Sequence, residues 1–249
     1  MSQHREFDQI RGVMKPVTVG IVAAMPSEAR SLGVTVLPKQ VQKIDDGVML
    51  YICGVGPDNA ARATRRLIQA GAGGIVSWGT AGGMVANLAS GTALLPGTII
   101  GTDAAYETDN TWTTRLRERL ATSVSLDNAA IYSGGQLVAG ETEKKERAAA
   151  TGAIAVDMES GVIAQAASAA GVSFISVRVI ADPLSCTLPS ALGNAIDDKG
   201  FVSIAAVLKG VARKPAEIIP MMQVALHFRR ATQVLALISR LAGPRLLAP

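Results

Sequence analysis

The hydrophobic residues of the chain fall into two alternating patterns, short apolar runs and segments with helical spacing. The apolar runs Val17–Ala24, Val48–Cys53 and Ile75–Trp78 are typical of strands buried in a sheet. Helical spacing follows the second run, from Ala60 to Gln69. This alternation predicts a single-domain α/β fold in three layers, with a mixed, largely parallel central sheet covered by helices on both faces.

The segment from Ala155 to Pro183 predicts a helix, a turn and a buried strand. Its helix is indicated by apolar residues that recur at helical spacing, which are Met158, Val162, Ile163, Ala166 and Ala170. Asp157 is a suitable N-cap for this helix, and Gly171 is a suitable residue to end it. Phe174–Ile180 then predicts a buried strand that one charged residue, Arg178, interrupts.

Two carboxylates flank these elements. Glu159 lies at the start of the predicted helix, and Asp182 comes just after the predicted strand. Ligands of open α/β sheets bind beyond the carboxyl ends of the strands. Each carboxylate, taken alone, is also compatible with an ordinary solvated surface group. Because both stand beside apolar runs, we expect them to face one pocket.

Two glycine-rich turns follow predicted strands. The first, Gly54–Asn59, precedes a helix and is compatible with a phosphate cradle. It lacks the lysine of a P-loop, so a purely structural tight turn is the alternative. The second, Gly79–Met84, contains three glycines, which would let the backbone approach a ligand closely.

Two short helices carry charged side chains. Glu28 would lie in the first turn of a helix that follows the first strand, near the positive end of the helix dipole. A second short helix is predicted at Thr142–Ala150, with Glu143, Lys144 and Arg147 exposed to solvent.

Composition excludes several classes of function. The 249 residues are 49% hydrophobic and only 4% aromatic, so a large core is expected and nucleic-acid binding by aromatic stacking is not. Cys53 and Cys186 match no metal or disulfide spacing, and no signal peptide is recognised, which predicts a reducing, cytoplasmic location. Neither His4 nor His227 lies in a catalytic motif, so acid–base chemistry is assigned to carboxylates.

Positive charge is concentrated at the end of the chain. Residues 199–249 carry a net charge of +7, whereas the remainder carries −3. We therefore expect a flexible polar leader at 1–15, a catalytic core at 16–198 and a basic helical extension at 199–249 packed on the core, with breaks at Pro215 and Pro220. The apolar residues of the extension either pack on the core or, together with the cations, rest on anionic lipid at the inner face of the membrane.

Five short motifs occur in order over residues 17–183. They are GIVAAM with Glu28 three residues on, GTAGGM, SGGQLV, AVDMES and VRVIAD. Together they resemble the purine nucleoside phosphorylase and methylthioadenosine/adenosylhomocysteine nucleosidase superfamily. The resemblance implies cleavage of the N-glycosidic bond of an adenine nucleoside, without a metal or organic cofactor.

The resemblance also implies roles for individual residues. Met158 would pack on the sugar, Glu159 would bind its hydroxyls, and Asp182 would protonate the purine as the general acid. Leu137 and Val138 would line the adenine site, and Thr80 and Gly82 would lie beside the ribose or the attacking group. Superfamily members assemble from several subunits, so the resemblance implies a homodimer.

Glu28 bears on the identity of the nucleophile. It matches the glutamate with which the nucleosidase branch activates water. The phosphorylase branches tend to have Gly-Asp-Pro and an arginine at this place, and this chain does not. Phosphate nevertheless stays open as a co-substrate. Ala181 departs from the nucleosidase pattern, which has serine before the acid.

A further likeness covers the rest of the chain. ADPLSCTLPSAL, the following Asp198-Lys199-Gly200 and VLKGVARKPAEIIPMM resemble the hopanoid-associated phosphorylases, which implies a lipid-linked nucleoside, adenosylhopane, as substrate. Two alternatives remain. One is an enzyme acting on soluble methylthioadenosine, adenosylhomocysteine or another purine nucleoside. The other is a nucleoside-binding protein without catalytic activity.

Overall fold

A computed structural model describes residues 17–190, 195 and 197–249. The leader predicted at 1–15 lies outside the described residues. Most of the described chain forms short strands and helices. In chain order they are β1 (Val19–Ala23), α1 (Pro26–Arg30), β2 (Gln42–Asp45), β3 (Val48–Ile52), α2 (Pro57–Gln69), β4 (Gly74–Gly83), β5 (Ala93–Leu94), β6 (Thr98–Ile100), β7 (Ala105–Glu107), α3 (Asn110–Leu120), β8 (Leu126–Asp127), β9 (Ile131–Ser133), α4 (Glu141–Thr151), β10 (Ala155–Asp157), α5 (Ser160–Ala169), β11 (Ser173–Asp182), α7 (Ile204–Arg213), the 3-10 turn η1 (Pro215–Glu217) and α8 (Ile218–Ala242).

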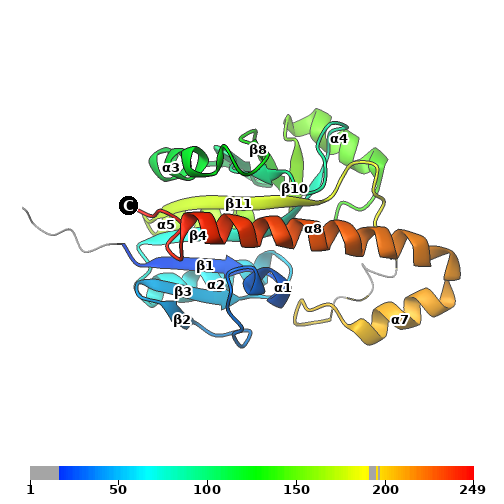
Figure 1. The fold of residues 1–249 in the computed structure, drawn as a ribbon, viewed down its shortest axis with the longest axis horizontal. Helices are drawn as coiled ribbons and strands as arrows, with labels where there is room; N and C mark the ends of the chain where they lie inside the picture. Colours follow the sequence, from blue (N-terminus) through cyan, green and yellow to red (C-terminus); the bar gives the residue numbers. More distant parts are fainter. Residues whose placement is uncertain (1–16, 191–194, 196) are drawn as a thin grey trace, which may run out of the picture.

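The strands form one mixed sheet with β4 at its centre (Figure 1). β4 pairs in parallel with β1 on one side and with β11 on the other, and its last residues pair antiparallel with β10. β1 is a fully buried apolar run, and β11 is buried along almost its whole length with Arg178 as its charged interruption, because helices cover both faces of the sheet. The predicted mixed, largely parallel sheet is therefore confirmed.

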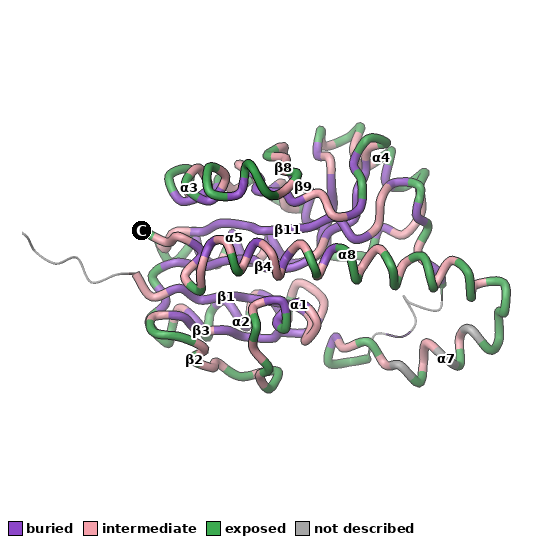
Figure 2. The backbone as a smooth tube through the Cα atoms, in the orientation of Figure 1, coloured by how far each residue is buried: buried purple, intermediate pink, exposed green. Residues whose placement is uncertain are grey.

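Helices pack on the sheet from both sides, which gives the expected three layers. Helices α1, α3 and α8 lie on one face, and α2 and α5 lie on the other. Side chains of β1 alternate between the two cores: Val19 and Ile21 pack toward α3 and α8, whereas Val22 packs toward α2. Figure 2 shows the buried strands lying between the partly exposed helices.

The segment Ala155–Pro183, which was predicted to begin with a helix, begins with a short strand. Ala155–Asp157 is β10, which pairs in parallel with β9, and α5 begins only at Ser160. Three residues are too few to show a strand pattern in the sequence. This strand forms because its backbone groups pair with those of β9. Glu159 occupies the N-cap position predicted for Asp157, although Asp157 Oδ1 still accepts from the Ser160 amide at 3.2 Å.

The C-terminal region is helical, with one break where two were expected. α7 ends at Arg213, and Pro215 opens the 3-10 turn, so that break is confirmed. Pro220 does not interrupt α8, because it lies in the first turn of the helix, where backbone N–H groups have no intrahelical partner. Among the described residues, no helix is both long and apolar enough to cross a membrane.

α8 runs along the sheet and then extends past it toward α7 (Figure 1). Its second half is anchored by Ala231, Leu235, Ile238 and Ala242, which are buried against β11 and β4. Beyond its end, the Leu246 carbonyl accepts a hydrogen bond from Trp112 Nε1 at 2.6 Å. The first half of α8 is left to cover the region beyond the carboxyl ends of the strands.

Candidate active site

A cavity of about 420 Å³ lies at the carboxyl ends of β1, β4 and β11. All eight positions singled out from the sequence line it, namely Glu28, Thr80, Gly82, Leu137, Val138, Met158, Glu159 and Asp182. They come from segments that are up to 154 residues apart in the sequence, between Glu28 and Asp182. The structure thus brings these residues together, and their chemical roles stay predictions.

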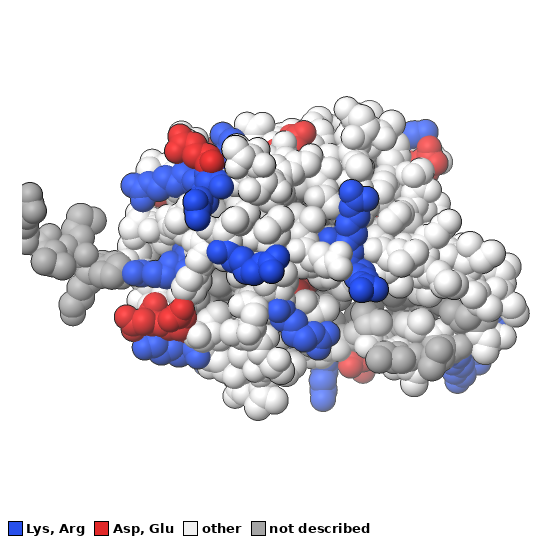
Figure 3. Space-filling model, in the orientation of Figure 1, with Lys and Arg blue, Asp and Glu red and all other residues white. Residues whose placement is uncertain are grey.

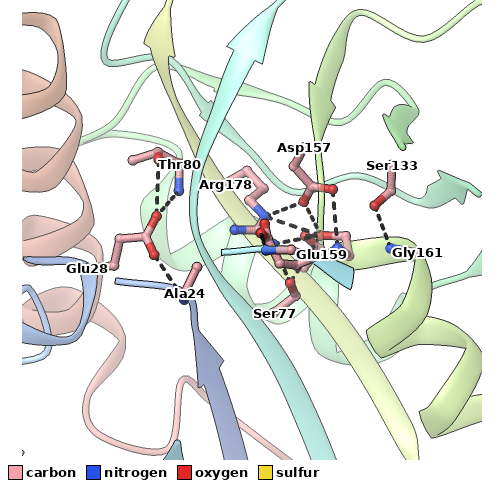
Figure 4. Close-up of polar contacts among 12 residues, drawn as sticks. Ala24, Glu28, Ser77, Thr80, Ser133, Asp157, Glu159, Gly161 and Arg178 are labelled. Carbon is pink, nitrogen blue, oxygen red and sulfur yellow. Dashed lines mark hydrogen bonds and ion pairs between the residues drawn. The ribbon is translucent and has the colours of Figure 1, made fainter. Parts of the chain in front are cut away.

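Glu28 is held in place by both of its carboxylate oxygens (Figure 4). It lies in the first turn of α1 and is 1% exposed. Oε2 accepts from the amides of Ala24 and Met25 at 3.1 and 3.0 Å, and Oε1 accepts from the amide and hydroxyl of Thr80 at 2.9 and 3.1 Å. Burial raises the pKa of Glu28, and the positive charge of Arg178 and these hydrogen bonds partly offset that effect.

Arg178 is the buried cation at the centre of the site, and sequence analysis assigned it no role. Its Nε lies 2.7 Å from Asp157 Oδ2, and its guanidinium also donates to the hydroxyls of Ser77 at 2.6 Å and Ser160 at 3.1 Å. The Arg178 and Asp157 side chains are 2% and 1% exposed. The sequence did contain a signal for this residue, namely a charged side chain within an apolar strand. A buried cation requires a buried partner, so its position indicated an anion nearby.

Glu159 is a buried carboxyl group of the cavity whose pKa is raised. Its Oε1 accepts from the Gly56 amide at 2.8 Å, so the first glycine-rich turn serves a carboxylate of the protein itself. Gly56 has φ 107°, a backbone conformation that favours glycine. Burial raises the pKa of Glu159 to about 7, although Arg178 opposes this rise, and Asp157 adds to it.

Asp182 is paired with a lysine that the sequence placed in solvent. Lys144 Nζ lies 2.8 Å from Asp182 Oδ2, and the Lys144 side chain is fully buried whereas Asp182 keeps 14% exposure. The expectation of an exposed Lys144 is therefore wrong. α4 is polar on all sides in sequence, so its pattern does not show which lysine faces the protein. Burial raises the pKa of Asp182, and the adjacent Lys144 ammonium partly offsets this.

Two glycines of β4 leave the space that these charged groups occupy. A Cβ atom at Gly79 would lie 2.6 Å from Glu28 Oε1 and 2.5 Å from a guanidinium nitrogen of Arg178. A Cβ atom at Gly82 would lie 2.8 Å from Asp182 Oδ2, where a bulge separates Ile180 from Asp182. The glycines therefore make room for side chains of the site, in addition to the close approach of a ligand predicted for them.

The first half of α8 supplies an apolar wall that sequence analysis did not assign to the site. The wall residues recur at i, i+3, i+4 and i+7, and they are Met221, Val224, Ala225 and Phe228. This spacing places them on one face of the helix, toward the cavity. This helical spacing of apolar residues was present in the sequence. It did not distinguish a cavity wall from a face that packs on the core, because the outer face of the helix is apolar as well.

The charge of the cavity lining is uneven. Glu28, Asp157, Glu159 and Asp182 line the cavity, whereas no Lys or Arg is among the described lining residues. Arg178 contacts Asp157 and Lys144 contacts Asp182, and neither cation is itself a lining residue. Within the described part of the chain, no group of three or more His, Cys, Asp or Glu side chains is arranged to hold a metal ion.

Comparison with known proteins identifies a family. A family model described as the phosphorylase superfamily matches residues 18–219. A sequence comparison with curated proteins finds no match.

Several solved structures share the fold. A 5'-methylthioadenosine/S-adenosylhomocysteine nucleosidase from Helicobacter pylori is 16% identical with a TM-score of 0.66, covering 89% of this chain and 95% of the other. A futalosine hydrolase from Helicobacter pylori is 17% identical with a TM-score of 0.66, covering 90% and 95%. An S-adenosylhomocysteine nucleosidase from Streptococcus pyogenes is 21% identical with a TM-score of 0.65, covering 91% and 98%.

Proposed function

The chain belongs to the phosphorylase superfamily, and from this membership we propose that it cleaves the N-glycosidic bond of an adenine nucleoside. One observation carries the proposal. Three carboxyl groups, Glu28, Glu159 and Asp182, meet at one cavity, and burial raises the pKa of each. Groups with perturbed pKa values that converge in a cleft are typical of catalytic sites.

Asp182 is the general acid in this proposal. Adenine is a poor leaving group as an anion, so N7 takes a proton while the bond between N9 and C1' breaks. A raised pKa keeps the donor protonated closer to neutral pH, as this step requires. The sugar becomes cation-like, and the Glu159 carboxylate stabilises it and binds its hydroxyls. Met158 packs on the sugar, while Leu137 and Val138 lie against the base.

Water is the nucleophile that the lining favours. Glu28 is held by Thr80 and by two backbone amides, in a position to act as the base for a water molecule. A phosphate ion would enter a space lined by carboxylates, without a Lys or Arg among the described lining residues. Like charges repel strongly in such a low-dielectric setting, so we expect hydrolysis without phosphate.

The apolar wall of α8 supports a substrate with a large apolar 5' substituent. Met221, Val224 and Phe228 border the same cavity as the carboxylates, and the exposed Val202 and Leu137 stand at its edge with 38% and 39% exposure. We propose adenosylhopane as the substrate, with soluble methylthioadenosine or adenosylhomocysteine as the alternative. The short apolar 5' group of methylthioadenosine would leave much of this wall uncovered.

The outer face of the same helix supports contact with a membrane. Ile219, Met222 and Leu226 lie on one face of α8 and are 69%, 62% and 62% exposed. A helix that is apolar on both faces is normally buried on both. Figure 3 shows Lys and Arg side chains spread over the molecular face on which α8 lies, which suits anionic lipid. We propose that this face rests on the cytoplasmic surface of the membrane.

Product analysis tests the proposed reaction. Purified protein is incubated with adenosylhopane in vesicles, and separately with methylthioadenosine and adenosylhomocysteine, with and without phosphate. We expect adenine and a free sugar from adenosylhopane, at a rate that phosphate does not change. Faster cleavage of a soluble nucleoside would move the assignment to the alternative substrates, and no adenine from any of them would contradict the proposal.

Co-sedimentation with vesicles tests the membrane contact separately. We expect the protein to bind vesicles that contain anionic lipid, and Arg229→Glu/Arg230→Glu to lose most of this binding. The matched control is Arg65→Glu/Arg66→Glu, which reverses two exposed charges on α2, on the opposite face of the sheet. Equal, negligible binding of all three proteins to anionic and neutral vesicles would overturn the membrane contact.

A further inference from the structure

Lys144 is the fully buried lysine of α4, and the polar contacts that its side chain makes with the described residues all go to one short segment. Its ammonium lies 2.8 Å from Asp182 Oδ2 and 3.3 Å from each of the backbone carbonyls of Asp182, Pro183 and Cys186. An ammonium group has three N–H donors, and four acceptors surround this one. The lysine therefore connects α4 to the end of β11 and to the turn after it.

The position of Lys144 is chemically specific. Asp182 lines the cavity, whereas Lys144 does not, so the lysine reaches the carboxylate from behind. A contact that only joined α4 to the turn would need the carbonyl groups and not the carboxylate. A buried ammonium is costly unless an anion pairs with it, and Asp182 is the carboxylate that the structure places beside it.

Other titratable groups face Asp182 as well. His227 of α8 and Cys186 of the turn after β11 both interact with it electrostatically. An imidazole changes its charge near neutral pH, whereas the lysine ammonium normally stays charged there. The effect of Lys144 must therefore be separated from that of His227 by mutation.

We propose that Lys144 is a positioning residue for proton transfer, which holds one oxygen of the Asp182 carboxyl group and stabilises the carboxylate left after the proton has moved to the nucleobase. This inference rests on the proposed function. Because Oδ2 accepts from the ammonium, the transferable proton is carried by Oδ1. In the step itself, the O–H bond of Asp182 breaks, an N–H bond forms at N7, and the electrons of the glycosidic bond pass to the base. Lys144 keeps its own proton throughout.

Lys144 also balances the acidity of Asp182. Burial alone would favour the neutral carboxylic acid, which holds a proton well but releases it reluctantly. The ammonium favours the ionised form and so makes the group a stronger acid. Removing the ammonium should keep Asp182 protonated to higher pH and slow the transfer of the proton.

Titration of Asp182 tests this directly and does not require turnover. Protein labelled with carbon-13 at the aspartate carboxyl carbons is followed by NMR against pH, and the Asp182 signal is assigned by its loss in Asp182→Asn. We expect Lys144→Met to raise the pKa of Asp182, Lys144→Arg to leave it near that of the natural protein, and Lys145→Met to have no effect. Lys145 is the matched control, because it is an exposed neighbour whose salt bridge is to Glu141.

The pH profile of turnover gives a second readout. Activity falls at high pH as Asp182 loses its proton. In Lys144→Met we expect this fall to move to higher pH while maximal turnover drops by about tenfold or more, a part of the roughly 10²–10⁴ that a general acid contributes. The pH profile of His227→Asn is measured in parallel. If the fall in activity at high pH shifts by a similar amount in that variant, the fall is due to the imidazole and the inference is wrong.

Three results separate the possible failures. If Lys144→Met folds and is less active but Asp182 titrates as in the natural protein, the lysine is only a structural connection and the inference is wrong. If Lys144→Met does not fold, Lys144→Gln, which keeps a neutral donor to the carbonyls, must raise the Asp182 pKa, and an unchanged value refutes the inference. If the natural protein cleaves no adenine nucleoside, the proposed function fails, while the titration still decides whether Lys144 controls Asp182.

Discussion

Replacing Arg178 with methionine should destabilise the fold by about 3–5 kcal/mol, the usual cost of removing one partner from a buried ion pair. Methionine fills much of the space of the arginine stem, so the main loss is the charge and not the packing. The change leaves Asp157 buried without its cation, whose Nε lies 2.7 Å away, and removes the guanidinium hydrogen bonds to the Ser77 and Ser160 hydroxyls. Glu28 and Glu159 lose the same positive charge.

The loss can be measured by urea unfolding, followed by tryptophan fluorescence. Both Trp78 and Trp112 are fully buried, so their emission reports the loss of tertiary structure. A natural domain has a stability of only about 5–15 kcal/mol, so the expected loss is a large share of the total. The exposed Arg66, replaced by methionine, is the matched control and should change stability by less than about 0.5 kcal/mol.

The pH dependence of this loss has a definite sign. Without Arg178, the pKa values of Glu28 and Glu159, which are already raised, rise further above those of the unfolded chain. Groups with a raised folded pKa favour the folded state at low pH, and this contribution is lost as pH rises through the folded pKa. The deficit should therefore be smaller at pH 5 than at pH 8, and Asp157→Asn added to Arg178→Met should recover part of it. A deficit below about 1 kcal/mol, or one independent of pH, would refute the reasoning.

Three other predictions concern the reaction and the assembly. Glu28→Gln should lower turnover by about a hundredfold or more, since it removes the base for water, and a strict requirement for phosphate in the natural protein would contradict this role. Because the pKa of Glu159 is about 7, kcat/KM should rise as pH passes through 7 and the carboxylate forms; the same rise in Glu159→Gln would assign it to another group. The contribution of Glu159 to folding stability changes with pH in the opposite direction to kcat/KM. Its raised folded pKa favours the folded state at low pH, and this contribution is lost as pH rises through about 7. We expect a homodimer in sedimentation at micromolar concentration, and a monomer alone would show that expectation to be wrong.

The sequence pattern predicted the sheet and a pocket shared by Glu159 and Asp182 for one physical reason. Residues such as Asp182 follow apolar runs that can only be buried strands, and the carboxyl ends of parallel strands meet at one edge. Glu28 was assigned to the site only through the resemblance of its motif to the superfamily. The fold therefore brings together residues whose local patterns were already clear.

Other features could not be predicted because they depend on tertiary contacts. Several charged residues surround Lys144 in sequence, and only the docking of the turn after β11 distinguishes it from Lys145. The strand β10 is too short for a pattern and exists through its pairing with β9. The wall formed by Phe228 and its neighbours depends on how far α8 extends past the sheet.

The rate of adenine release by Asp182→Asn, compared with that of the natural protein, tests the central claim most directly. Asparagine keeps the shape of the side chain and can still accept from Lys144, but it has no carboxyl proton to deliver. We expect release to fall by at least about a hundredfold in a variant that still folds and binds adenine, with a lower melting temperature because the buried Lys144 ammonium loses its anionic partner. Near-normal release by the folded variant would contradict the assignment of this cavity as the place where the glycosidic bond is broken with Asp182 as the acid.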